Sequence, residues 1–71
     1  MTADDRALIQ RLFTLATIIL EDSQSAALAG QSLKRRPKEY ARYADVLLTA
    51  ARDLEANAQI ILLVLNRKPI A

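Results

Sequence analysis

Apolar residues recur with a seven-residue period along the second half of the chain. Within residues 40–65 one column of large side chains runs beside a column made mainly of alanine. The large column is Tyr40, Leu47, Leu54 and Ile61, and the small column is Ala44, Ala51, Ala58 and Leu65. This spacing predicts one long helix, about residues 37–65, that packs lengthwise against another helix. We expect the alanine column to form the seam that holds the two helices together.

A second helical pattern occupies about residues 3–29. Thr2 precedes it and fits an N-cap, because its hydroxyl can accept a hydrogen bond from a backbone N–H of the first turn. Ala16, Ser23 and Gly30 recur every seven residues along the centre of its apolar face. Small residues there predict close approach of the other helix. We expect the Ser23 hydroxyl to bond to a carbonyl one turn earlier.

The connection between the two patterns is short. We expect Gly30 to end the first helix in the left-handed conformation and Pro37 to occupy the first turn of the second. Long helices joined this tightly fold back on each other. The predicted fold class is therefore all-α, a single antiparallel two-helix hairpin domain over residues 1–71, completed to a four-helix bundle or docked on a partner.

The open end of this hairpin is more apolar than a two-helix contact requires. Ile60, Leu63 and Val64 are expected to point away from the large column, and Ile18 lies off the main face of the first helix. Leaving such side chains in water forfeits about 1.5–3 kcal/mol each relative to burial. We therefore predict an interface with a second copy or with a larger protein, and less readily with a membrane surface. The predicted partner-binding residues are Leu12, Phe13, Ile18, Ile19, Ile60, Leu63 and Val64.

The connection is strongly basic. Its cations are Lys34, Arg35, Arg36, Lys38 and Arg42, relieved only by Glu39. Such a cluster can contact phosphates of RNA or DNA, and Tyr40 and Tyr43 could stack on bases. The competing interpretation is a solvated loop tip, with both tyrosines closing the loop end of the bundle.

Composition narrows the chemistry further. The chain has no cysteine, no histidine and a formal net charge of only +2. A disulfide framework and a conventional zinc site are excluded, and no arrangement of residues fits a catalytic, cofactor or metal site. We expect a protein that is not an enzyme and needs no cofactor. The acidic start lacks the pattern of a secretory signal, which favours a cytoplasmic location.

Two known families share parts of this pattern. The alternating alanine and leucine layers resemble those of the small plasmid-copy-control RNA-binding proteins of the Rop type, in which a helical hairpin dimerises into a four-helix bundle. That resemblance implies architecture and a dimer. It extends to no RNA-contact residue of the first helix.

The chain also resembles the small helical-hairpin co-chaperones of type III secretion systems. The similar features are the overall length, the Met1-Thr2 start, the sequence Pro37-Lys38-Glu39-Tyr40, and Leu54-Glu55 followed by Ile60-Ile61 and Val64. This resemblance implies a cytoplasmic adaptor that binds a larger helical-repeat chaperone and helps to guard the needle subunit before export. We expect either this protein–protein function or a homodimeric regulator that binds RNA or DNA through the basic loop.

Overall fold

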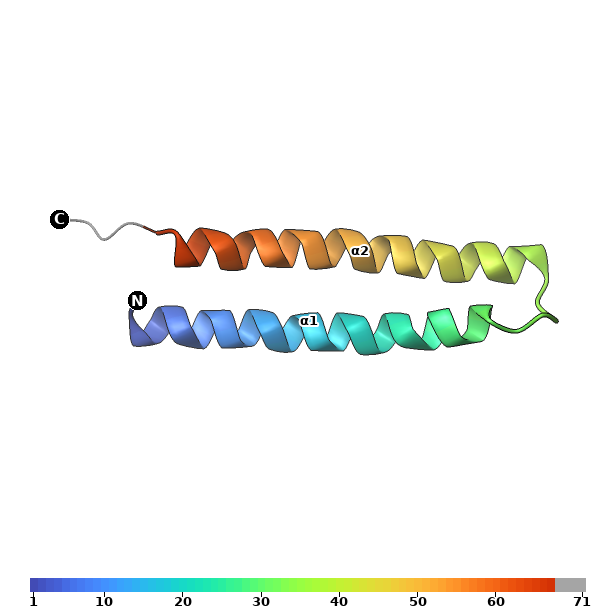
Figure 1. The fold of residues 1–71 in the computed structure, drawn as a ribbon, viewed down its shortest axis with the longest axis horizontal. Helices are drawn as coiled ribbons and strands as arrows, with labels where there is room; N and C mark the ends of the chain where they lie inside the picture. The colour runs from blue at the N-terminus through green and yellow to red at the C-terminus, as the bar shows by residue number, and fades with distance from the viewer. Residues whose placement is uncertain (68–71) are drawn as a thin grey trace.

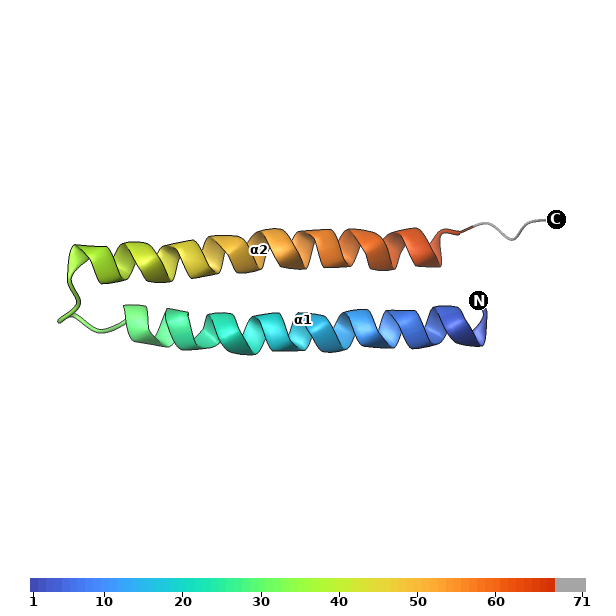
Figure 2. The same ribbon diagram turned by 180° about the vertical axis from the view of Figure 1, so that it is seen from behind.

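The computed structural model describes residues 1–67, and they form two long helices. Helix α1 spans Ala3–Gly30 and helix α2 spans Pro37–Leu65. The helices lie side by side and antiparallel, so the N-terminus sits beside the end of α2 (Figure 1), and the view from behind shows the same arrangement (Figure 2). The predicted all-α hairpin is confirmed, and the helix bounds agree with the prediction to within one residue.

The hairpin is a thin rod. Its extents are 60 × 15 × 11 Å and its radius of gyration is 16.7 Å, whereas a compact domain of this length would have a radius of gyration of roughly 11 Å. Only Ala26, Asn57, Ile61 and Val64 are buried among the described residues. Two helices alone therefore enclose very little core.

Two side-chain hydrogen bonds of α1 form as the sequence predicts. The Thr2 hydroxyl accepts a hydrogen bond from the Asp5 N–H at 3.0 Å, which caps the helix. The Ser23 hydroxyl donates to the Leu20 carbonyl at 3.0 Å. Ser23 is thus a small packing residue of the helix, as expected.

The predicted left-handed conformation at Gly30 is wrong. No residue of the described chain has a positive φ, and Gly30 is the last residue of α1. The cap residue Gln31 is also right-handed, its N–H donates to the Leu28 carbonyl at 3.2 Å, and the Ser32 N–H donates to the Ala29 carbonyl at 3.4 Å. A tightened last turn satisfies these carbonyls, so no left-handed residue is needed.

The face of α1 that packs on α2 is the predicted one. Ala16, Ser23 and Gly30 are all half-buried, and so are Ile9 and Leu12. A Cβ placed on Gly30 would lie 3.9 Å from the Tyr43 ring, which shows how closely α2 approaches there.

The predicted seam of α2 is half right. In the large column Ile61 is buried and Leu54 half-buried, whereas Leu47 keeps 41% of its surface exposed. The alanine column does not face α1, because Ala44, Ala51 and Ala58 are all exposed. Helix α1 lies instead against the column on the other flank of the leucines, formed by Tyr43, Ala50, Asn57 and Val64.

This rotation has a physical reason. Tyr43 and Val64 remove more apolar surface from water than alanines at the same levels would. Asn57 can enter the seam because its amide Nδ2 donates to the Leu12 carbonyl at 3.0 Å. The alanine column is left free on the surface.

Candidate protein interface

One side of the hairpin is apolar along most of its length. On α1 it carries Phe13, Leu20 and Ala27, which recur every seven residues and therefore share a face. Leu20 and Ala27 line a shallow groove together with Leu47 of α2, which places both helices on this side, and Glu21 and Gln24 of α1 line the same groove. We call this surface the apolar side. It consists of Phe13, Leu20, Ala27, Ala44, Leu47, Ala51, Leu54, Ala58 and Leu65.

The large members of the apolar side are well exposed in the hairpin. Phe13 keeps 58% of its surface in contact with solvent, Leu20 54% and Leu65 50%. No member of this set is charged, and one charged residue, Glu21, lines the groove on this side. The column of Phe13, Leu20 and Ala27 on α1 ends at charged positions. Arg6 lies seven residues before Phe13 and Lys34 lies seven residues after Ala27.

The opposite side of the hairpin is different in character. A second groove between the helices is lined by the apolar residues Ile19, Val46 and Ala50, by Ser23 and Thr49, and by four charged residues. These charged residues are Asp22, Arg42, Asp45 and Asp53. We call this surface the polar side. The two sides differ although the same two helices build both.

The predicted partner-binding residues do not form one surface. Val64 is only 5% exposed, so the expectation that it points away from the hairpin is wrong, and it packs in the seam. Leu12 and Ile19 are half-buried in the same seam. Phe13 lies on the apolar side.

Three of the predicted residues are exposed away from the apolar side. Ile60 and Leu63 lie near the open end, whereas Ile18 lies near the middle of the rod, next to Ile19, which lines a groove with Ala50. Ile18, Ile60 and Leu63 are 49%, 45% and 71% exposed. Residues 53, 60 and 67 are spaced by seven, so Ile60 continues the polar side beyond Asp53. Their role in binding stays a prediction.

Sequence reasoning missed Leu20, Ala27, Leu47 and the alanine column as candidate binding residues. The signal was present in the seven-residue spacing of Phe13, Leu20 and Ala27, and in the alanine column itself. The alanines were assigned to the intramolecular seam because spacing alone does not tell which helix covers a column.

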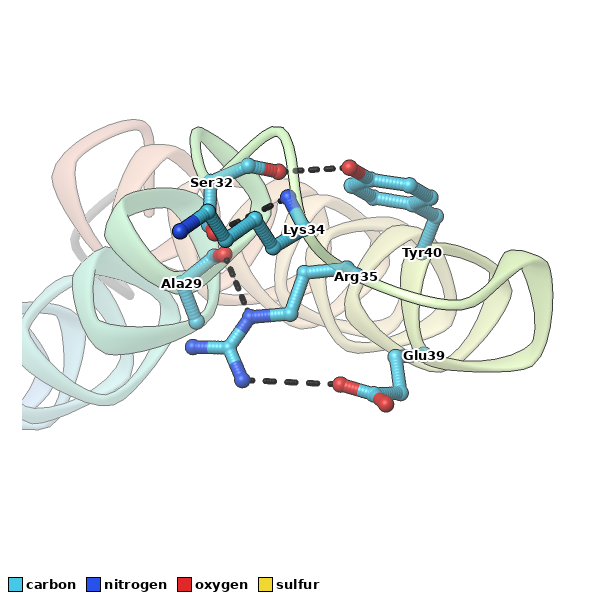
Figure 3. A network of polar contacts seen from close by, with 6 residues as sticks. All are labelled: Ala29, Ser32, Lys34, Arg35, Glu39 and Tyr40. Atoms are coloured by element: carbon cyan, nitrogen blue, oxygen red, sulfur yellow. Dashed lines mark hydrogen bonds and ion pairs between the residues drawn. The ribbon is translucent and has the colours of Figure 1, made fainter.

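The basic loop is held by specific polar contacts, drawn in Figure 3. The Arg35 guanidinium donates through Nε to the Ala29 carbonyl at 3.2 Å and lies 3.5 Å from the Glu39 carboxylate. The Tyr40 hydroxyl donates to the Ser32 carbonyl, and the Lys34 N–H donates to the Ser32 hydroxyl at 3.3 Å. Tyr40 therefore closes the loop end of the hairpin.

Two of the cations lie over one aromatic ring. The guanidinium carbons of Arg35 and Arg42 are each 5.7 Å from the centre of the Tyr43 ring, within the range of cation–π attraction. Tyr43 is half-buried against α1. These contacts give Arg35 and Arg42 structural roles, and binding of nucleic acid by Lys34, Arg35, Arg36, Lys38 and Arg42 stays a prediction.

Other classes of site receive no support from the described residues. Among residues 1–67, no three carboxylate side chains gather as a metal site would require. Neither of the two described helices has the length and apolar content that crossing a membrane demands. Among the described residues, the apolar side is therefore the strongest candidate for a functional surface.

None of the protein-family models matches this chain, and comparison with curated proteins and with solved structures finds no significant match. The fold and the surfaces described above therefore carry the functional argument by themselves.

Proposed function

We propose that this chain is a non-enzymatic helical-hairpin adaptor that acts by packing its apolar side against helices of a protein partner. The observation that carries the proposal is the apolar side itself, which presents Phe13, Leu20 and Leu65 at half exposure or more and has one charged residue, Glu21, in the lining of its groove. Contiguous apolar surface of this kind is typical of protein interfaces.

The thin core supports the same proposal. A chain below about 80 residues without disulfides or metal needs extensive helix packing or a partner chain for stability. Here three apolar residues, Ala26, Ile61 and Val64, are buried among those described. A partner that covers the apolar side would complete the core that the hairpin lacks.

A helix of the partner is the structural element that fits the apolar side best. Alternation of leucine and alanine at heptad spacing forms holes that accept side chains of a facing helix. Residues 1–67 form no strand whose edge an extended peptide could join. In the setting implied by the resemblance to type III secretion co-chaperones, the helices would belong to a larger helical-repeat chaperone.

Site-specific photocrosslinking tests the proposal. We would replace Leu47, on the apolar side, with p-benzoylphenylalanine and irradiate cells of the natural host. The matched control places the same photoreactive residue at Arg52, on the far side of α2 from α1. We expect a discrete crosslinked protein from position 47 and little from position 52. Equal yields from both positions would contradict the proposal.

The open end offers a second check on the co-chaperone setting. We expect Ile60→Asp and Leu63→Asp to disrupt capture of a helical-repeat partner if Ile60 and Leu63 contact it. Gln59→Asp is the control, because it adds the same charge to the same turn without removing an apolar side chain. If the double variant still binds that partner as tightly as the control, these residues lie outside the interface.

A further inference from the structure

The partner of the apolar side can be specified further from the described residues. We infer that a second copy of this chain covers the apolar side, with its loop at the opposite end, so that Ala51 faces Ala51 and Leu20 faces Leu20 across a two-fold axis. This inference rests on the proposed function and names the partner of the same surface.

The first argument is the amount of surface left exposed. The chain exposes 5977 Å², whereas a compact monomer of this length would expose roughly 4,400 Å². The excess is above about 1,000 Å², which is comparable to the roughly 800 Å² that each partner buries in a standard interface. One copy packed over the apolar side would remove an excess of this size.

The second argument is the symmetry of the apolar side about a single level of the rod. The Asn57 to Leu12 hydrogen bond and the approach of Gly30 to Tyr43 fix how α1 and α2 align. Between these points Ile19 and Ala50 line the same groove, so Leu20 and Ala51 stand at nearly the same level. A two-fold axis perpendicular to the rod at this level crosses both helices at the middle of their apolar columns.

On α2 this axis produces a self-complementary contact. Ala44 and Ala58 lie seven residues before and after Ala51. In an antiparallel pair of α2 helices, Ala44 therefore meets Ala58 of the second copy, and Ala51 meets its own equivalent. Small residues at these three meeting points allow the two backbones to approach closely.

The same axis produces a large-to-small contact on α1. Phe13 and Ala27 lie seven residues before and after Leu20. Phe13 of one copy therefore meets Ala27 of the other, so the bulkiest side chain of the surface stands opposite one of the smallest. Such alternation fills space without overlap.

The third argument is electrostatic. Five cations and a single carboxylate occupy residues 34–42 at the loop end. At the open end, within residues 1–9 and 60–67, the carboxylates of Asp4 and Asp5 offset the cations of Arg6 and Arg67, and the Asp5 carboxylate lies 3.6 Å from the Arg67 guanidinium. Placing both loops at the same end would bring two basic clusters together, whereas the opposite orientation sets each beside a balanced end. Charge therefore selects the orientation with loops at opposite ends.

Cysteine pairing tests the arrangement, because the natural chain has no cysteine to interfere. We expect Ala51→Cys to form a disulfide-linked dimer on mild oxidation, and a mixture of Ala44→Cys with Ala58→Cys to form the mixed dimer. Ala56→Cys is the matched control, since it lies seven residues after Thr49 of the polar side and should stay largely unlinked. A dimer in which Ala51→Cys links no more readily than Ala56→Cys would overturn the arrangement.

A second measurement avoids any change at the interface. Leu33 is 96% exposed at the loop tip, so a spin label on Leu33→Cys leaves the apolar side intact. Since α2 has 29 residues, loops at opposite ends should place the two labels more than about 40 Å apart at 1.5 Å per residue. A label separation well below this value would overturn the proposed orientation.

The solution mass distinguishes failure of the inference from failure of the proposed function. Light scattering across a concentration series should give twice the chain mass for the unmodified protein. A monomer at all concentrations would overturn the inference. If position 47 still crosslinks a different protein in the host, the adaptor function stands without the homodimer.

Discussion

The amide Nδ2 of Asn57 donates a hydrogen bond to the main-chain carbonyl of Leu12 at 3.0 Å, and within the described residues it is the one hydrogen bond that joins α1 to α2. Asn57 is only 5% exposed, and its other amide atom, Oδ1, has no protein partner. A buried polar group at a heptad position fixes register at a cost in stability. This residue therefore sets how far along α1 the second helix lies.

Replacing Asn57 with leucine should stabilise the protein while loosening its register. The Leu12 carbonyl retains its own helical hydrogen bond, and a buried oxygen without a partner is removed, so we expect the free energy of unfolding to rise by about 1 kcal/mol. Urea unfolding at a fixed protein concentration measures this change. Asn57→Ala is the control and should lower stability, because it leaves a cavity. A large loss of stability in Asn57→Leu would show that the hydrogen bond outweighs the buried oxygen.

Two adjacent residues near the end of α2 should differ in how much the same substitution destabilises the fold. Val64 is 5% exposed and Leu63 is 71% exposed. Val64→Asp buries an unpaired carboxylate and should cost more than about 3 kcal/mol, enough to unfold much of the hairpin. Leu63→Asp should preserve the helical circular dichroism spectrum. Equal loss of helix in both variants would contradict the burial of Val64 in the seam.

Charge on the apolar side should separate the copies of the inferred dimer. Ala51→Glu places a carboxylate opposite its equivalent in the second copy, so we expect a monomer of reduced stability. Ala56→Glu makes the same change on the polar side of the same helix and should leave the dimer intact. Analytical ultracentrifugation of both variants reads out the difference. A dimeric Ala51→Glu would place the interface elsewhere.

Gly30→Ala should make the protein slightly more stable. The new Cβ would meet the Tyr43 ring at 3.9 Å, an ordinary van der Waals contact, and the backbone there is right-handed. Since alanine favours helix over glycine by up to about 1 kcal/mol and Gly30 stands in the last turn, we expect a gain of about 0.5 kcal/mol. A rise in the thermal midpoint checks this. A fall would indicate that α2 approaches α1 too closely to admit a methyl group.

The basic loop makes a separate prediction about nucleic acid. If Lys34, Arg35 and Arg36 contact phosphates, labelled RNA or DNA should bind at low salt with an affinity that falls steeply as salt is added. Arg36→Ala should then weaken binding without affecting the fold, whereas Arg35→Ala also removes the contacts to Ala29 and Glu39. The absence of any binding at low salt would leave the loop a solvated tip.

The two helices and their ends follow from local chemistry that the sequence displays directly. Thr2 offers a capping hydroxyl, Pro37 suits a first helical turn, and the apolar period is that of a packed helix. Because the connection between the helices is short, the antiparallel hairpin follows as well. The right-handed end of α1 at Gly30 could not be predicted from the sequence, because a glycine permits a left-handed residue without requiring one.

The tertiary structure decided which face of α2 meets α1. The sequence shows a leucine column flanked by two others, and either flank could have completed the seam. The small side chains of Ala44, Ala51 and Ala58 favoured their flank as the seam. The polar side chain of Asn57 argued against the other flank. A hydrogen bond to a carbonyl 45 residues away makes Asn57 acceptable there, and spacing along one helix does not reveal such a partner. The sequence thus determined which residues are apolar and where the helices run, while the packing of α1 determined which of them were left on the surface.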